Sequence, residues 1–399
     1  MTDTLKPRDA KDVEAAVQWA LAGDKTLEIL GHGSKRGIGR AAQWDLSLDL
    51  SNLSGVILYE PEELILSAKA GTPIADIEVL LAKHNQELAF EPLDYGPVFG
   101  GAAGRGTVGG VLAANLSGPR RIKAGAARDH FLGVTAVSGR GETFKSGGRV
   151  VKNVTGYDLC KVLAGSWGTL AVMTDVTVKV LPRAETEETL LVLGLDDAAA
   201  ARAMSIAMGS SNDVSGAAHF PEPLGATVQA EAGQAITALR LEGVAPSVTH
   251  RRHALEALLK PFGEITVFAE EDSRALWKAV REVRPFTQGE RALWRISVAP
   301  ARGHEVAAAI GGGAEYFYDW AGGLIWVALP AEDDGGAARV RRAIGPSGHA
   351  TLIRAPAAIR AAVPVFEPQE AGLAALTRRV KESFDPNGLL GPGRMYAGV

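Results

Sequence analysis

Glycine is dense between residues 100 and 118, where the chain reads GGAAGRGTVGGVLAANLSG and carries a single charged side chain, Arg105. Because glycine has no side chain and reaches positive φ, successive backbone N–H groups in such a stretch can converge on an anion such as pyrophosphate. A second glycine turn, GHGS at residues 31–34, follows the short apolar run 27–30 and offers the same chemistry. Two such turns predict one bound dinucleotide.

The overall composition is that of a globular protein with no affinity for nucleic acid. The 399 residues are 46% hydrophobic and 22% charged, with a formal net charge of −4. This length suits two or three domains, and this charge builds no basic field for nucleic acid. Residues 1–10 contain no apolar signal region, and no run of about 18 apolar residues follows. We therefore expect a cytoplasmic protein without a transmembrane segment.

Cysteine usage limits the redox chemistry that this chain can hold. Cys160 is the only cysteine in the sequence. One thiol excludes an intrachain disulfide framework, and it also excludes a four-cysteine iron–sulfur or zinc site supplied by this chain alone. Electrons that leave a cofactor bound here must therefore pass to partner proteins.

The glycine turns need a rigid unit around them, and residues 1–183 predict an α+β one. Thr72 and Pro73 indicate a helix start, with threonine as the cap and proline at the first helical position. Pro182 follows a β-branched strand and marks the end of the unit. The other elements predicted here are a helix over 9–22 and strands over 27–30, 57–59, 64–68, 134–137 and 172–181, with a hairpin turn at 138–142.

From about Glu185 the sequence changes character, because glycine becomes rarer and strand-like and helix-like segments alternate at lengths typical of βαβ units. Strands are predicted over 189–193, 238–241, 264–268, 293–298 and 324–329. Helices are predicted over 196–208, 249–259, 273–283, 303–310 and 336–344. We expect a second, α/β layer domain, then a last amphipathic helix over 370–384 and a turn-rich tail near the first domain.

Six segments carry a family resemblance when they are taken in order: 31–34 (GHGS), 107–118 (TVGGVLAANLSG), 152–158 (KNVTGYD), 165–170 (GSWGTL), 293–297 (LWRIS) and 318–323 (YDWAGG). The sequence resembles the vanillyl-alcohol-oxidase, or PCMH-type, FAD-binding family, and within it the FAD-binding E subunits of bacterial glycolate oxidases. The resemblance implies a two-part FAD-binding domain, residues 1–183 and 352–399, interrupted by an α/β, ferredoxin-like cap over 184–351.

The resemblance also implies the cofactor and the partners. FAD would be the cofactor, and the chain would stand beside a related catalytic flavoprotein subunit and an iron–sulfur subunit. Such a hetero-oligomer oxidises glycolate, a small 2-hydroxy acid, to glyoxylate. Any attachment to the inner membrane would come through these partners.

Carried over by position, the resemblance assigns contacts with each part of FAD. The pyrophosphate meets the backbone of the first turn, with one serine hydroxyl as an added donor: Gly31, His32, Gly33 and Ser34. The opposite wall is formed by Thr107, Val108, Gly109 and Gly110. The ribityl and flavin side is lined by Asn115, Ser117 and Gly118, Gly168 and Thr169 complete the pocket, and Pro92 lies beside the adenosine or ring portion. On this pattern oriented N–H dipoles stabilise two phosphate charges, and no lysine is required.

Two short motifs near the first turn have alternative interpretations. Residues 37–42 (GIGRAA) fit the G-x-G-x-x-A fingerprint of a Rossmann fold, with Glu60 as the ribose-binding acid. Residues 31–36 separate that motif from the preceding strand, which favours a loop instead. A histidine in this loop attaches FAD covalently in some relatives, but the place of His32 between two glycines favours backbone donation and a dissociable flavin.

Two sets of charged and aromatic side chains each have two possible roles, one in a binding site and one in the structure. One set lines the flavin site or solvates a loop and a helix end: Lys152, Asn153, Tyr157, Asp158 and Lys161. The other set forms the roof of a carboxylate pocket, with Arg295 pairing with substrate, or belongs to a half-buried strand: Trp294, Arg295, Tyr318, Asp319 and Trp320.

No residue stands out as the base for the chemistry. Removing a proton from a 2-hydroxy acid while a hydride moves to flavin requires a positioned histidine or carboxylate. The paired His-x-His plus Gly-Asp-Gly-Asn pattern of the catalytic subunit of the same complex is missing around His84, His130, His219, His250, His253, His304 and His349. His250 and His253 lie beside arginines, which favours solvation over metal binding. We therefore assign no catalytic residue and no metal site.

Three hypotheses follow from the sequence. The leading one is an FAD-binding subunit that contributes a flavin and a docking surface more than the substrate base. The first alternative is a self-sufficient FAD-dependent 2-hydroxy-acid dehydrogenase with its cap as the substrate site. The second alternative is a non-catalytic scaffold that keeps the FAD fold.

Overall fold

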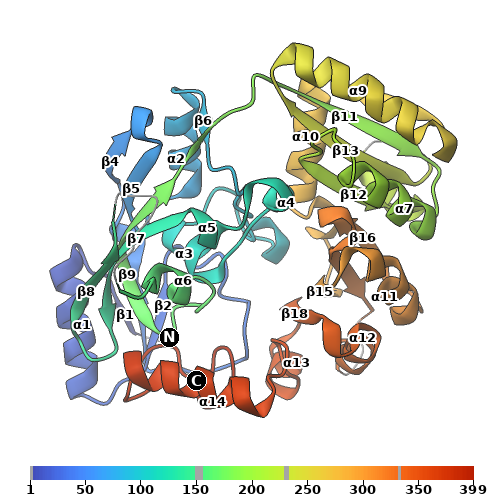
Figure 1. The fold of residues 1–399 in the computed structure, drawn as a ribbon. Helices are drawn as coiled ribbons and strands as arrows, with labels where there is room; N and C mark the ends of the chain where they lie inside the picture. Colours follow the sequence, from blue (N-terminus) through green and yellow to red (C-terminus); the bar gives the residue numbers. More distant parts are fainter. Residues whose placement is uncertain (1–2, 149–155, 229–232, 331–333) are drawn as a thin grey trace. The chain divides into compact units, whose positions relative to one another are not determined.

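The computed structural model describes residues 3–148, 156–228, 233–330 and 334–399 (Figure 1). The chain divides into two compact units. The first comprises Met1–Ser117, Gly125–Arg183 and Pro368–Val399, and the second comprises Gly118–Ala124 and Ala184–Glu367. No helix among these described residues is long and apolar enough to cross a membrane.

A small parallel sheet carries the first glycine turn of the first unit. Its strand order is β1 (Asp3–Leu5), β3 (Leu46–Asp49) and β2 (Leu27–Leu30). Helix α1 (Ala10–Ala22) packs on it through a buried apolar stripe, Val13, Val17 and Ala20. Asp9 caps this helix by accepting hydrogen bonds from the N–H groups of Lys11 and Asp12, which confirms the predicted helix start.

A five-stranded antiparallel sheet forms the rest of the core of the first unit. Its order is β4 (Val56–Glu60), β5 (Ile65–Lys69), β9 (Ala171–Lys179), β7 (Phe131–Ser138) and β8 (Thr143–Gly147). The predicted hairpin is the β7–β8 pair. The remaining elements are α2 (Ile74–Ala82), β6 (Gln86–Glu87), α3 (Val108–Ala114), α5 (Ala127–His130), α6 (Leu159–Leu163) and β10 (Leu181–Pro182).

The start of helix α2 differs from the prediction. Its cap position is occupied by Pro73, which makes no side-chain capping bond. The Thr72 hydroxyl instead donates to the carbonyl of Lys69 at 2.6 Å. The threonine therefore closes the turn that follows β5, where its hydroxyl also bonds to the backbone of Gly55.

The C-terminal segment returns to the first unit through α14 (Ala371–Phe384) and a tail that lies beside β2. The Leu27 N–H donates to the Leu389 carbonyl, and the Gly391 N–H donates to the Leu27 carbonyl, both at 2.8 Å. The only buried residue of α14 is Lys381. Its ammonium donates to the carbonyls of Thr169 and Leu390 and to the carboxylate of Asp385.

The second unit is built on an eight-stranded antiparallel sheet that consists of two repeats. The first repeat has the strands β11 (Thr186–Leu193), β12 (Gly216–Phe220), β13 (Ile236–Gly243) and β14 (Ile265–Phe268), in the order β14-β11-β13-β12. The second has β15 (Ala292–Ser297), β16 (Glu315–Asp319), β17 (Leu324–Leu329) and β18 (His349–Arg354), in the order β16-β17-β15-β18. Each repeat therefore has the ferredoxin-like order 4-1-3-2, as the sequence predicts for the cap.

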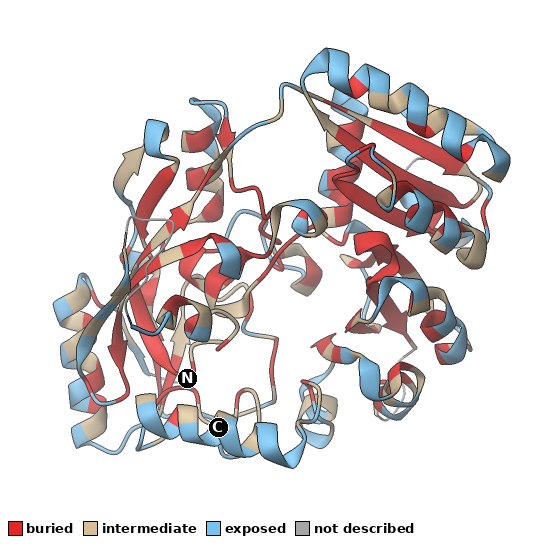
Figure 2. Cartoon of the chain, viewed as in Figure 1, coloured by how far each residue is buried: buried red, intermediate tan, exposed pale blue. Residues whose placement is uncertain are grey.

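Helices connect the strands of each repeat and cover the sheet. They are α7 (Asp197–Met208), α9 (Ala245–Leu259), α10 (Glu270–Arg281), α11 (Gly303–Ile310) and α12 (Ala337–Ile344), with the shorter α4 (Arg121–Ala124), α8 (Glu222–Val228) and α13 (Ala357–Ala362). The apolar faces of α7 and α9 share one core with β11 and β13. Figure 2 shows these strands as buried and the outer faces of the helices as exposed.

Two features of the second unit depart from the sequence prediction. Strands β12, β16 and β18 were not predicted, and β12 and β16 form the seam between the repeats through the single pair His219 and Tyr318. The return to the first unit falls at Pro368 rather than at residue 352, because β18 pairs with β15 and completes the large sheet. The assignment of 1–183 and 352–399 to an FAD domain and 184–351 to a cap stays a prediction.

Candidate functional site

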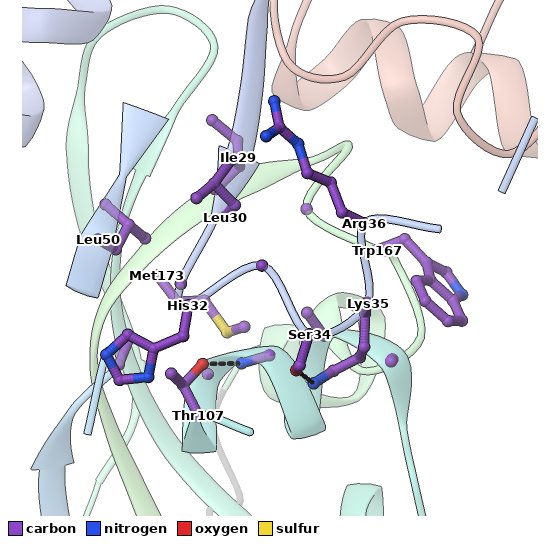
Figure 3. Close-up of a pocket in the computed structure, with 18 of the residues that line it drawn as sticks. Ile29, Leu30, His32, Ser34, Lys35, Arg36, Leu50, Thr107, Trp167 and Met173 are labelled. Carbon is purple, nitrogen blue, oxygen red and sulfur yellow. Dashed lines mark hydrogen bonds between the residues drawn. The ribbon is translucent and has the colours of Figure 1, made fainter. Parts of the chain in front are cut away.

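A pocket opens in the first unit where the turn after β2 faces the start of α3 (Figure 3). Its volume is about 720 Å³, and it is open to solvent. Three segments that are far apart in the chain form most of its walls: 28–36, 107–114 and 167–173. The C-terminal tail adds Arg394.

The backbone of the first turn approaches α3 as closely as a glycine allows. A Cβ atom on Gly31 would lie 2.7 Å from the hydroxyl oxygen of Thr107, so no side chain fits there. Gly33 has a φ of +75°, which favours glycine, and a Cβ atom added there would meet nothing within 4 Å. The turn therefore presents bare backbone to an open space, which suits a ligand that lies against it.

The start of α3 is already occupied by internal hydrogen bonds. The Thr107 hydroxyl caps the helix by accepting from the Gly110 N–H at 3.2 Å. The N–H groups of Val108 and Gly109 donate to the carbonyls of Thr72 and Ala70. The expected row of free N–H donors on this wall is therefore not formed, because the first turn of α3 is bonded to the turn after β5.

A buried lysine, Lys35, supplies positive charge to the pocket that the sequence prediction omitted. The residue is 8% exposed, and its Nζ donates to the Ser34 hydroxyl at 3.2 Å. A Cβ atom on Gly110 would lie 3.3 Å from this Nζ, so the ammonium lies over the first turn of α3. Burial lowers the pKa of Lys35 to about 8, the Asp94 charge opposes this shift, and the Arg394 charge adds to it.

A paired carboxylate forms another part of the pocket wall. Glu28 on β2 is 3% exposed and accepts three hydrogen bonds from the Arg36 guanidinium, at 2.9, 3.0 and 2.5 Å. The Ser47 hydroxyl donates to the same carboxylate at 3.0 Å. The hydrogen bonds that Arg36 donates to Glu28 raise the pKa of Arg36. This acid is therefore neutralised by its partners, and the charge that the pocket offers to a ligand is positive.

Arg394 joins the C-terminal tail to the lysine turn. Its Nη2 donates to the backbone carbonyl of Lys35 at 3.2 Å, and its guanidinium lies 5.9 Å from the centre of the Trp167 ring. The Arg394 carbonyl accepts from the N–H of Arg40 at 2.9 Å. The only sequence signal for the contact between Arg394 and the Lys35 carbonyl is the presence of an arginine in the turn-rich tail.

The structure divides the predicted cofactor residues into two groups. Those that line the pocket are Gly31, His32, Gly33, Ser34, Thr107, Gly109, Gly110 and Gly168. Those outside its lining are Pro92, Val108, Asn115, Ser117, Gly118 and Thr169. Contact of either group with FAD stays a prediction.

Internal bonds explain most of the second group. Asn115 ends α3 with a φ of +49° and accepts from the Arg128 N–H. The Ser117 hydroxyl accepts from the Ala127 N–H, and the Thr169 hydroxyl donates to the Ser166 carbonyl. The Gly118 carbonyl accepts from the Trp320 indole within the second unit. These side chains and this carbonyl stabilise turns and helix ends.

Local geometry excludes the Rossmann interpretation near the first turn, and a dissociable flavin beside His32 stays a prediction. Residues 37–42 form irregular backbone with no helix after them, so the strand–turn–helix of a Rossmann fold is not formed. His32 lines the pocket, and its Nδ1 lies 3.2 Å from the Arg105 carbonyl. Residues 100–105, the first part of the glycine-rich stretch, are exposed or half-buried and lie outside the pocket lining.

The described members of the charged and aromatic set between residues 152 and 161 do not line the pocket. Lys152 and Asn153 lie outside the described residues. Tyr157 is 90% exposed, and Lys161 donates to the Phe131 carbonyl while it pairs with Asp158 at 3.5 Å. The neighbouring Cys160 is buried, which raises the pKa of its thiol to about 11.

In the second unit two arginines stack on one indole ring. The guanidinium carbons of Arg121 and Arg295 lie 4.4 and 4.9 Å from the centre of the Trp320 ring. Arg295 is a half-buried residue of β15, as the strand interpretation predicts. Desolvation of the His349 ring lowers its pKa, and the Arg295 charge lowers it further.

The other members of that set are structural. Trp294 is buried and donates to the Gly335 carbonyl, and Asp319 accepts from the Trp320 N–H. Tyr318 donates to the carboxylate of Asp197 at 2.8 Å, and His219 lies 3.3 Å from the same carboxylate.

His32 and the paired Glu28 are the histidine and carboxylate side chains that line the described pocket. His250 and His253 are exposed on α9. Among the residues that the structure describes, no group of three histidine, cysteine, aspartate or glutamate side chains lies close enough to hold a metal ion.

Comparisons with known proteins add three findings. Residues 4–147 match the family model described as an FAD binding domain. The chain is 33% identical to glycolate oxidase subunit GlcE of Escherichia coli over 385 residues, which is 96% of this chain and 95% of that protein. It is also 40% identical to glycolate oxidase subunit GlcD of Bacillus subtilis, over 25% of this chain and 21% of that one.

A solved structure shows the same fold at low sequence identity. The chain matches p-cresol methylhydroxylase with substrate bound at a TM-score of 0.73 and 15% identity, covering 98% of this chain and 88% of the other. The pocket fits the diphosphate of FAD on its own geometry. It offers bare backbone at Gly31 and Gly33 and a buried ammonium at Lys35.

Proposed function

We propose that this chain, which belongs to the family of the glycolate oxidase subunit GlcE, is the FAD-binding subunit of an assembly that oxidises glycolate to glyoxylate. It is an FAD-dependent oxidoreductase subunit with an α+β fold of the PCMH type. The observation that carries the proposal is the full-length similarity to GlcE, joined to a pocket that fits a dinucleotide. A cytoplasmic location belongs to the same proposal.

In this proposal the FAD diphosphate lies against the turn 31–34, opposite the start of α3. Gly31 and Gly33 allow the approach, Ser34 offers a hydroxyl, and Gly168 lines the pocket beside Ile29 of β2. When bound, FAD supplies the capacity to take two electrons from a 2-hydroxy acid. The described residues of this chain bind and orient the cofactor through backbone groups and positive charge.

The abstraction of the substrate proton belongs, in this proposal, to a partner flavoprotein subunit. In the described pocket, Glu28 is held by Arg36 and Ser47, and His32 faces a backbone carbonyl. An iron–sulfur subunit is the expected electron acceptor, because a single cysteine holds no cluster.

The test compares the isolated chain with the complete assembly. Glycolate is added to each under anaerobic conditions, and the visible flavin absorbance is followed. We expect the flavin of the isolated chain to stay oxidised and that of the assembly to bleach. A tagged copy of the chain should also recover a second flavoprotein and an iron–sulfur protein from its own cells.

Each alternative gives a different result. Bleaching of the isolated chain at catalytic rates contradicts the division of labour and favours a self-sufficient dehydrogenase. The arginines on Trp320 in the second unit would then be the first place to seek the substrate carboxylate. A colourless chain that still assembles into an active complex favours a scaffold.

A further inference from the structure

Lys35 is a buried charge that lacks a charged partner within the described protein. Its one hydrogen-bond acceptor among the described residues is the neutral Ser34 hydroxyl. The acid whose charge acts on it is Asp94, whose two carboxylate oxygens already accept from the N–H groups of Gly96 and Gly104. Burial of an ammonium without an anion costs free energy, so this arrangement suits a negatively charged ligand.

The position of the ammonium selects the kind of anion. Lys35 lies between the Ser34 hydroxyl and the first turn of α3, and its side chain lines the pocket (Figure 3). The start of α3 cannot supply many donors itself, because Val108, Gly109 and Gly110 use their N–H groups internally. A diphosphate needs more positive charge than the remaining backbone provides, and a lysine ammonium provides it as a point charge.

We infer that the Lys35 ammonium forms an ion pair with the diphosphate of FAD, so that cofactor binding is coupled to the protonation of this one lysine. The inference rests on the proposed function, because it takes the pocket to be the FAD site. It adds a binding residue, and it makes retention of the cofactor depend on pH.

The charged groups around Lys35 determine the direction of that dependence. Asp94 favours the protonated lysine, and Arg394 on the C-terminal tail disfavours it. Glu28 and Arg36 on β2 and its turn neutralise each other. Because burial lowers the pKa of Lys35 to about 8 without ligand, the free pocket loses its ammonium as pH rises past that value. FAD should therefore bind more weakly at pH 9 than at pH 7.

The experiment titrates the full-length chain, stripped of flavin, with FAD and follows the quenching of flavin fluorescence between pH 6.5 and 9. The variants are Lys35→Met, Lys35→Arg and the control Lys6→Met. Lys6 is an exposed lysine of the same unit whose removal changes the net charge equally. Inorganic pyrophosphate is the competing probe.

Loss of a charge-assisted hydrogen bond costs roughly 1.5–3 kcal/mol, so we expect Lys35→Met to weaken FAD binding by about 10- to 100-fold at pH 7. The affinity of the wild type should fall toward that of Lys35→Met as pH rises. Lys35→Met should show little pH dependence, and Lys35→Arg should keep its affinity at pH 9. Pyrophosphate should compete for the wild type more strongly than for Lys35→Met.

A thermal melt separates binding from a structural role. Without FAD, Lys35→Met should melt at a higher temperature than wild type, because a buried unpaired charge is removed. With saturating FAD, the rise in melting temperature should be smaller for this variant than for wild type.

Equal FAD affinity of wild type and Lys35→Met contradicts the inference and leaves the proposed function intact. A less stable apo form of Lys35→Met together with unchanged FAD affinity also contradicts it, since it indicates a structural lysine. A wild type that binds no FAD at any pH contradicts the proposed function itself, and the inference with it.

Discussion

Two buried lysines of the first unit, Lys35 and Lys381, have opposite surroundings. They are 8% and 4% exposed, and burial lowers the pKa of both. Lys381 donates to two carbonyls at 2.7 and 2.8 Å and to the Asp385 carboxylate at 2.6 Å. Lys35 donates to one hydroxyl and lines a pocket.

The difference in hydrogen-bond partners distinguishes a buried lysine with a structural role from one placed to bind a ligand. Asp385 also accepts from the N–H groups of Leu389 and Leu390, so the Lys381 site has donors and acceptors matched on every side. It ties α14 to the tail beside β2 and to the turn at Thr169. The Lys381 ammonium contacts the Asp385 carboxylate, whereas the Lys35 ammonium faces a pocket. The predictions below test whether this contrast in partners, rather than burial itself, decides the role of each residue.

The largest effect is expected for Lys381→Met. Removal of one partner from a buried ion pair leaves the other charge uncompensated, which costs about 3–5 kcal/mol. The free energy of unfolding in guanidinium chloride should fall by that amount, with Lys6→Met as the control. A loss below about 1 kcal/mol contradicts the structural role of Lys381. FAD affinity of the fraction that stays folded should change little.

The pH dependence of stability should isolate the contribution of Lys35 next. A lysine whose pKa is lowered in the folded state binds fewer protons there than in the unfolded chain, so stability increases with pH between the two pKa values. For Lys35 this window runs from about 8 to the ordinary lysine pKa of 10.5. The flavin-free wild type should gain at most about 3 kcal/mol relative to Lys35→Met across it.

Urea unfolding of both proteins at pH 7.5, 9 and 10 measures this difference. Since Lys381 and all other titrating groups are common to both proteins, their contributions cancel. Parallel curves for the two proteins would show that Lys35 has an ordinary pKa in the folded state.

Glu28→Gln tests whether location in the pocket or satisfaction by partners determines the role. Glu28 lines the same pocket as Lys35 but is held by Arg36 and Ser47. The substitution should lower stability by about 1–3 kcal/mol, because a charged hydrogen-bond acceptor is lost. It should weaken FAD binding less than Lys35→Met does. If Glu28→Gln weakens FAD binding more than Lys35→Met does, location in the pocket rather than satisfaction by partners determines the role.

The smallest effect is expected for Thr107→Val, which keeps the shape of the side chain and removes the cap of α3. Loss of such a cap costs about 1 kcal/mol. The free N–H of Gly110 should then be open to a ligand, so FAD affinity should fall less than stability does. Chemical unfolding and FAD titration of the same sample measure both, and an unchanged stability argues against the cap.

The sequence predicts most elements of the first unit because their signals are local. Asp9 caps α1 as expected, and an alternating pattern with a glycine turn specifies the β7–β8 hairpin. Thr72 was wrongly predicted as the cap of α2. In the folded turn its hydroxyl lies within reach of the Gly55 and Lys69 carbonyls, and it bonds most closely to that of Lys69. Strand β12 was missed because Gly216, Ala217 and Ala218 carry no β-branched signal, and its pairing comes from neighbours distant in the chain.

The pocket is predicted in position but not in charge. Glycines mark where backbone can approach a ligand, so the stretches 31–34 and 100–118 were singled out from the residues themselves, whereas the contacts expected of 107–110 came from the family resemblance. The burial of Lys35 depends on α3 and on the tail near Arg394, and neither contact leaves a pattern around residue 35. Asn115 and Ser117 have residue types typical of ligand contacts, but they stabilise a helix end and a turn.

The bond between Arg394 and the Lys35 carbonyl joins residues 359 positions apart and adds the last wall to the pocket. A ribosome makes the turn at 31–34 early, then the whole second unit, and only afterwards the residues of this wall. A nascent chain therefore carries an incomplete pocket for most of its synthesis. Flavin should therefore bind only late in synthesis. Chains truncated before Arg394 should accumulate without bound flavin even where the three-stranded and five-stranded sheets of the first unit have formed.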